Sequence, residues 1–82
     1  MKKVLLIDDE KDAADSLSSW FEDKGYSIKT AYSGKEGIEY VMNFNPDVVV
    51  TDIKMPDMSG LEVLSAIKEY DEMIQVIVIT AF

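Results

Sequence analysis

Three short runs of aliphatic residues constrain the fold of this chain more than any other feature of its sequence. They cover residues 4–7, 48–51 and 74–80, and they are rich in valine and isoleucine. The first two are uninterrupted, which is typical of strands buried on both faces of a sheet. The third is a further apolar strand candidate, interrupted only by Gln75. These runs predict a sheet that is covered on both sides.

Longer segments with helical periodicity separate these runs. The first segment ends at Lys24 and Gly25, and a cation in the last turn followed by glycine is typical of a helix C-terminus. Residues 33–36 and 59–62 both follow the pattern Ser-Gly-x-Glu, which predicts a capping box at the start of two further helices. The apolar residues at helical spacing are Ala13, Ala14, Leu17, Trp20 and Phe21 in the first helix, Ile38, Val41 and Met42 in the second, and Leu61, Leu64 and Ile67 in the third.

Residues 26–31 complete the pattern, because their alternation of apolar and polar side chains predicts a half-exposed edge strand. The order of elements is therefore β-α-β-α-β-α-β. Strands joined by helical crossovers pair in parallel, with helices on both faces of the sheet. We therefore predict one domain of the doubly wound α/β class. A chain of 82 residues buries only about 60–65% of its unfolded surface, so its core is thin.

The composition excludes several classes of function. Eight lysines or arginines against 16 acids give a net charge of −8, which argues against binding to nucleic acid or to an anionic membrane. The chain has no cysteine and no histidine, so disulfides, zinc sites and imidazole-based catalysis are excluded. Any ligand or nucleophile must be an oxygen or a lysine. The apolar runs are too short for a signal peptide or a membrane span, so we expect a soluble, cytoplasmic protein.

Oxygen-bearing side chains end three of the predicted strands. Asp8 and Asp9 follow the first run, Asp52 follows the second, and Thr80 ends the last. Sites in open parallel sheets form at the carboxyl ends of the strands, so these aspartates converge if the first and third strands are neighbours. Three carboxylates in one cleft repel each other and raise at least one pKa. A hard divalent cation relieves this repulsion, and an oxygen-only ligand set suits Mg²⁺.

Each of these residues also has an ordinary structural explanation. Asp9 and Asp12 would stabilise the start of the first helix, and for that run alone a helix cap is the favoured interpretation. Thr80 is a common type of strand residue. Asp52 is harder to explain structurally, because it directly follows a buried valine run.

Taken together, these positions resemble the receiver domain of bacterial response regulators. The resemblance covers essentially the whole chain, and its most diagnostic part is the segment VVVTDIKMPDMSGLEVL around Asp52. It implies a flavodoxin-like sheet with strand order 2-1-3-4 in the part present here. In the loop of this segment, Pro56 fixes one backbone angle and Gly60 allows a close approach of the backbone near the helix start.

The resemblance also implies a role for each site residue. Asp52 would accept the phosphoryl group from a histidine kinase. Asp9 would bind Mg²⁺ directly, and Asp8 would act mainly through a metal-bound water. The backbone carbonyl of Lys54 would be another metal ligand, and Thr80 would donate its hydroxyl to the attached phosphoryl group. A carboxylate nucleophile gives a labile acyl phosphate, and Mg²⁺ neutralises charge on the reacting oxygens.

The sequence departs from the family at its C-terminal end. Receiver domains continue with a fourth helix, a fifth strand bearing a lysine at its end, and a fifth helix, whereas this sequence ends at Phe82. We therefore expect residues 1–82 to be an amino-terminal part of a receiver domain, with inefficient phosphorylation. The uncharged strand 74–79 would then be a sheet edge, which predicts self-association through this edge or through uncovered faces.

Two other functions fit part of the pattern. A phosphatase of the haloacid-dehalogenase type also places a nucleophilic aspartate at a strand end, with Mg²⁺. Such an enzyme needs a second aspartate two residues later, where this chain has Lys54. A fragment that cannot be phosphorylated and only binds partners is the third hypothesis, favoured by the missing lysine.

Overall fold

The aliphatic runs form strands and the periodic segments form helices in the computed structural model, which describes residues 2–79. The alternation of strands and helices predicted from the sequence is confirmed. Thr80 lies outside the described residues. In chain order the elements are β1 (Lys3–Ile7), α1 (Lys11–Asp23), β2 (Ser27–Ala31), α2 (Gly34–Phe44), β3 (Val48–Asp52), α3 (Gly60–Tyr70) and β4 (Gln75–Ile79).

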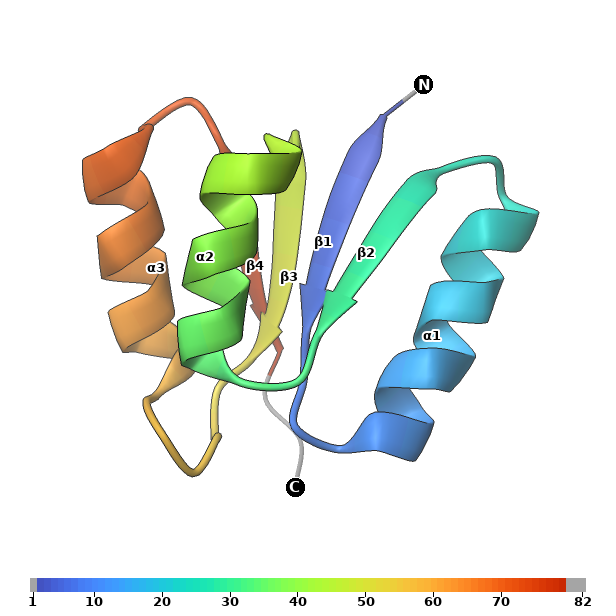
Figure 1. Ribbon diagram of the computed structural model, residues 1–82, viewed down its shortest axis with the longest axis horizontal. Coiled ribbons are helices and arrows are strands. Elements are labelled where there is room, and N and C mark those ends of the chain that lie inside the picture. The colour runs from blue at the N-terminus through green and yellow to red at the C-terminus, as the bar shows by residue number, and fades with distance from the viewer. Residues whose placement is uncertain (1, 80–82) are drawn as a thin grey trace.

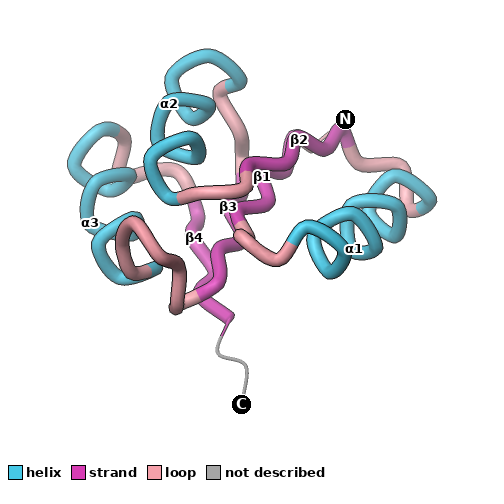
Figure 2. Tube along the Cα trace, turned by 60° about the horizontal axis from the view of Figure 1, so that its bottom comes forward, coloured by secondary structure: helices cyan, strands magenta, loops and turns pink. Residues whose placement is uncertain are grey.

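The strands form one parallel sheet in the order β2-β1-β3-β4. In the centre of the sheet, Leu6 of β1 is in register with Thr30 of β2 on one side and with Val50 of β3 on the other. Figure 1 shows all strands ending at the same side of the molecule. Figure 2 shows α1 on one face of the sheet and α2 and α3 on the other. The predicted doubly wound architecture is confirmed, and so is the strand order.

Side chains alternate between the two faces along each central strand, as the pleat of a strand requires. On the face covered by α2 and α3, Leu5, Ile7 and Val49 are buried together with Val63 and Ile67 of α3. The face covered by α1 has a smaller core, made of Val4, Leu6, Ala14 and Val50. Both faces of β1 are therefore buried, which explains why its sequence is a continuous aliphatic run.

The two predicted capping boxes differ in the structure. At α3 the box is complete, because Ser59 Oγ accepts from the Glu62 N–H and the Glu62 carboxylate accepts from the Ser59 N–H. At α2, Ser33 Oγ accepts from the Glu36 N–H, but the Glu36 carboxylate accepts from Tyr32 N at 2.9 Å. The predicted hydrogen bond from the Ser33 N–H to the Glu36 carboxylate is therefore wrong, since the side chain of Glu36 reaches one residue further back along the chain, to Tyr32.

Three large apolar side chains expected to face the core are exposed instead, and so is Ala13. Trp20 is 51% exposed, Met42 54% and Leu61 57%. Among the elements of residues 2–79, α1 alone covers its face of the sheet (Figure 2), and Trp20 packs edge-on against Phe21 at a centroid distance of 5.2 Å. In α3, the buried positions are Gly60, Val63 and Ile67, which turns Leu61 outward. No helix within residues 2–79 is long and apolar enough to cross a membrane.

Candidate metal centre at the carboxyl ends of the strands

Three carboxylates meet where β1 and β3 end. Asp8, Asp9 and Asp52 each offer one oxygen, and these oxygens all lie within 4.8 Å of one another. The convergence expected from the sequence is confirmed, because β1 and β3 are adjacent strands that end at the same edge. A hollow of about 80 Å³ lies beside the cluster; it is lined by Leu6, Ile7, Asp8, Leu17, Val50, Asp52 and Ile79.

Backbone hydrogen bonds fix two of these aspartates. The N–H of Asp8 donates to the Ala31 carbonyl at 3.0 Å, which extends the pairing of β1 with β2. One carboxylate oxygen of Asp8 accepts from Glu10 N at 2.9 Å, which closes the turn into α1. Asp52 is the last residue of β3, and its Oδ1 accepts from Ile53 N at 2.8 Å. Both side chains are therefore held at the edge of the sheet.

Asp9 does not cap α1. The N-cap residue of this helix is Glu10, and no side-chain hydrogen bond caps the helix. The cap that the sequence favoured for Asp9 is therefore wrong, while Asp12 does lie in the first turn of the helix. Asp9 is exposed and belongs to the acidic cluster, so its carboxylate is free to bind a ligand from solvent.

The electrostatics of the cluster favour a bound cation. Burial raises the pKa of the Asp8 carboxyl above its ordinary value of 3.8, and the negative charges of Asp52 and Asp9 raise it further. The hydrogen bond from Glu10 N acts in the opposite direction but does not cancel these effects. All three donors are oxygens, which are the ligands that hard divalent cations prefer. The residues present therefore fit a magnesium ion.

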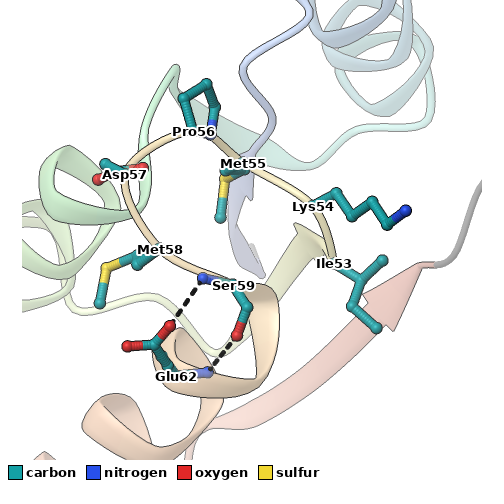
Figure 3. Close-up of a pocket in the computed structure, with 8 residues that line it drawn as sticks. All are labelled: Ile53, Lys54, Met55, Pro56, Asp57, Met58, Ser59 and Glu62. Carbon is teal, nitrogen blue, oxygen red and sulfur yellow. Dashed lines mark hydrogen bonds between the residues drawn. The ribbon is translucent and has the colours of Figure 1, made fainter.

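Of the other two predicted site residues, Lys54 and Thr80, only Lys54 lies within the described residues. Lys54 follows Asp52 in the β3–α3 loop, and its side chain is exposed and extends away from that loop (Figure 3). Thr80 lies outside the described residues. The loop borders a separate open hollow of about 580 Å³, lined by Ile53, Lys54, Met55, Pro56, Asp57, Met58, Ser59 and Glu62.

Comparison with known proteins agrees with this site. The family model of the response regulator receiver domain matches residues 4–82. The chain belongs to this family. The resemblance seen in the sequence is therefore confirmed, and the acidic cluster lies where receiver domains of two-component response regulators carry their phosphorylation site.

Two curated relatives illustrate the similarity of this receiver domain to known proteins. It is 37% identical to the transcriptional regulatory protein DltR of Streptococcus agalactiae over 79 residues, which is 96% of this chain and 35% of DltR. It is 36% identical to the sporulation initiation phosphotransferase F of Bacillus subtilis over 81 residues, which is 99% of this chain and 65% of that protein. The receiver domain described here thus spans less than two thirds of either relative.

A solved structure matches the fold closely. The response regulator TrrA of Thermotoga maritima, determined in complex with Mg²⁺-BeF, superposes with a TM-score of 0.94 at 36% identity. The match covers the whole of this chain and 71% of the TrrA chain. The three carboxylates therefore lie in a fold that, in TrrA, has been determined in complex with Mg²⁺-BeF.

Gly60 packs against the backbone of Asp52, and an added side chain at this glycine would disturb that backbone. A Cβ at Gly60 would overlap the carbonyl oxygen of Asp52 and would lie 2.9 Å from Ile53 Cα, and neither backbone atom can move freely. A Cβ at Gly34 would instead overlap the flexible side chain of Met58. Both glycines are the first residue of a helix that follows a serine cap, so they form a matched pair.

We therefore expect Gly60→Ala to lower the free energy of unfolding by about 1–3 kcal/mol, as overpacking against rigid neighbours does. Gly34→Ala should cost clearly less, because the Met58 side chain can move away. Urea unfolding of both variants measures the difference. Equal costs for the two substitutions would show that the Asp52 backbone tolerates the added methyl group.

Proposed function

We propose that this receiver domain accepts a phosphoryl group from a histidine kinase on the carboxylate of Asp52. The observation that carries the proposal is the three-carboxylate cluster, which contains Asp52 at the half-buried carboxyl end of a buried strand. Receiver domains as a family are phosphorylated by histidine kinases.

In the proposed reaction, a carboxylate oxygen of Asp52 attacks the phosphorus of the phosphohistidine donor. The new P–O bond forms as the bond from phosphorus to the donor nitrogen breaks, and the leaving nitrogen takes up a proton. Asp8, Asp9, Asp52 and the backbone carbonyl of Lys54 would hold Mg²⁺, which when bound neutralises negative charge on the phosphoryl oxygens. The proposal assigns to Thr80 the hydroxyl that donates to the attached phosphoryl group.

The residue at position 54 favours the receiver function over the phosphatase alternative. A phosphatase of the haloacid-dehalogenase type needs a carboxyl group two residues after its nucleophile to protonate the leaving group. Here Lys54 stands at that position and its side chain points into solvent. The site therefore lacks the general acid that such a phosphatase needs at this position.

Incubation with acetyl phosphate and Mg²⁺ tests the proposal. Because phosphorylation is expected to be inefficient, we expect intact mass to show a single added phosphoryl group on a fraction of the chains, and no phosphoryl group in Asp52→Asn. Asp12→Asn is the matched control, because it removes the same charge from the nearby first turn of α1 and should be labelled normally. Labelling that persists in Asp52→Asn would exclude Asp52 as the acceptor, and no labelling of the wild-type chain would favour the binding-only alternative. Release of inorganic phosphate much faster than the spontaneous hydrolysis of an acyl phosphate would favour the phosphatase.

We further propose that the chain associates with a second copy of itself through β4. This strand forms one edge of the sheet, and its sequence QVIVI has no charged residue. Ile77 is 52% exposed and Ile79 is 43% exposed on the same side of the strand. Exposed apolar edge strands pair readily with other chains, and an antiparallel pair of identical edges forms a closed two-fold dimer.

Sedimentation of the purified chain tests this association. We expect a dimer that Ile77→Lys converts to a monomer, because an added charge at a strand edge opposes pairing. Met42→Lys is the control, since Met42 is equally exposed but lies on α2, away from β4. A wild-type chain that sediments as a monomer at all concentrations would exclude this interface.

A further inference from the structure

Asp57 connects the loop after Asp52 to a helix that is distant in the sequence. Its two carboxylate oxygens accept hydrogen bonds from Gly34 N at 3.1 Å and from Lys35 N at 2.9 Å. These are the first two residues of α2, whereas Asp57 belongs to the loop between β3 and α3. In Figure 3 the Asp57 side chain lies on the side of the loop that faces α2, opposite to Lys54.

The two hydrogen bonds accepted by Asp57 stabilise the conformation of the loop more than they stabilise α2. α2 already has its own cap, because Ser33 Oγ accepts from the Glu36 N–H. Lys35 is exposed, so water can satisfy its N–H as well, whereas Gly34 is buried and its N–H depends on Asp57. Residues 53–59, in contrast, form no helix or strand that would hold them in one conformation. The hydrogen bonds from the Lys35 and Gly34 N–H groups lower the pKa of the Asp57 carboxyl below its ordinary value of 3.8.

Other contacts fix the loop on either side of Lys54. At the start of the loop, the Ile53 carbonyl accepts from Gly60 N at 2.7 Å. Further along, Met55 and Met58 pack against the core beneath α2 and α3. Met58 fits against Gly34 so closely that a Cβ on that glycine would overlap it. Lys54 therefore lies on a short span of backbone held by the hydrogen bond to Ile53, by the packing of Met55 and, further along, by the hydrogen bonds of Asp57.

We propose that Asp57 is a positioning residue for the metal site, holding the backbone of Lys54 so that its carbonyl faces the carboxylates of Asp9 and Asp52. This inference rests on the proposed function, which assigns the Lys54 carbonyl as a metal ligand. Asp57 itself touches neither the cation nor the phosphoryl group. Its effect is to reduce the reorganisation of the loop that binding requires, in the way that outer-shell groups orient metal ligands.

Magnesium titration followed by backbone amide NMR tests this role. In the wild-type chain, Mg²⁺ should shift the Gly34 and Lys35 amide signals, although these residues belong to α2 and not to the acidic cluster. In Asp57→Ala those two shifts should be lost, and Mg²⁺ should bind about tenfold more weakly. Asp57→Asn keeps one acceptor oxygen in a side chain of the same shape, so its affinity should be intermediate.

Asp47→Ala is the matched control for the charge. Asp47 is also an exposed loop acid that accepts a backbone hydrogen bond, from Lys3 N at 2.9 Å, but it lies at the start of β3, the opposite end from the cluster. Asp47→Ala should keep the wild-type Mg²⁺ affinity. If Asp57→Ala and Asp57→Asn both bind Mg²⁺ as tightly as Asp47→Ala, the positioning role is excluded and the metal site stands. If the wild-type chain shows no saturable Mg²⁺ response, the metal assignment itself fails.

Discussion

Replacing Asp9 with alanine is expected to weaken Mg²⁺ binding at least about tenfold while making the magnesium-free domain more stable. The loss of affinity follows because Asp9 is the exposed member of the cluster and would bind the ion directly. Removing a group that only orients a metal ligand already costs about 10- to 100-fold in affinity, so removing a ligand should cost no less.

The gain in stability follows from the repulsion within the cluster. The pKa of Asp8 is raised by burial first, and then by the charges of Asp52 and Asp9. An acid with a raised pKa binds protons more tightly in the folded state, so it makes folding less favourable as the pH rises above the ordinary value of 3.8. At neutral pH, Asp9→Ala removes part of this repulsion. The pKa of Asp8, followed by NMR, should fall in the variant.

Two measurements on the same samples check this prediction. Calorimetric titration gives the Mg²⁺ affinity, and thermal unfolding in a chelating buffer gives the stability without metal. Asp12→Ala serves as the control, because it removes one charge from the first turn of α1, outside the cluster. Unchanged Mg²⁺ affinity in Asp9→Ala would show that the ion binds elsewhere or not at all.

The fold could be predicted from the sequence because its strongest signals are local and agree with one another. The runs at 4–7 and 48–51 are buried on both faces, and such continuous aliphatic runs are difficult to place anywhere but inside a covered sheet. Gly25 follows Lys24, the C-cap residue of α1, and has a positive φ of 91°, as expected for a glycine that ends a helix. The strand order came from the family resemblance, since the sequence pattern alone does not specify which strands are neighbours.

The orientation of the helices was predicted less well. Helical spacing identifies an apolar stripe, but small differences in rotation decide which of its residues touch the sheet. In α3, Gly60 packs directly against the Asp52 backbone, and this contact fixes the rotation of the helix so that Val63 and Ile67 point inward. Leu61 was predicted on the inner face and is exposed for this reason.

The acidic cluster could be predicted from the sequence, but the contacts of Asp57 that hold the neighbouring loop could not. Asp8, Asp9 and Asp52 follow from one rule, that parallel strands bring their carboxyl ends to a common edge. The contacts of Asp57 depend on the path of an irregular loop and on its distance from α2, which no local pattern encodes. An aspartate beside a proline in a loop is typical of an ordinary turn, so the sequence carried no signal for this role.

The second large effect is expected in the core, where Leu5→Ala should lower the free energy of unfolding by about 2–5 kcal/mol. Leu5 is fully buried in the central strand β1, between Lys29 of β2 and Val49 of β3. It belongs to the core under α2 and α3, where the surrounding strands leave little room to collapse into the cavity. For a small domain whose total stability is about 5–15 kcal/mol, this loss is a large fraction of the whole.

Leu61→Ala is the same chemical change at a position where the sequence predicted burial and the structure places the side chain in solvent. Leu61 is 57% exposed on α3, so its truncation should change the free energy of unfolding by about 0.5 kcal/mol or less. Alanine is also a good helix former, which offsets part of any lost contact. Urea denaturation of both variants compares the loss of a buried leucine with the loss of an exposed one. The difference in the free energy of unfolding tests whether α3 turns Leu61 away from the sheet. If Leu61→Ala lowered the free energy of unfolding about as much as Leu5→Ala, then Leu61 would be buried, either against the sheet or against a second copy of the chain.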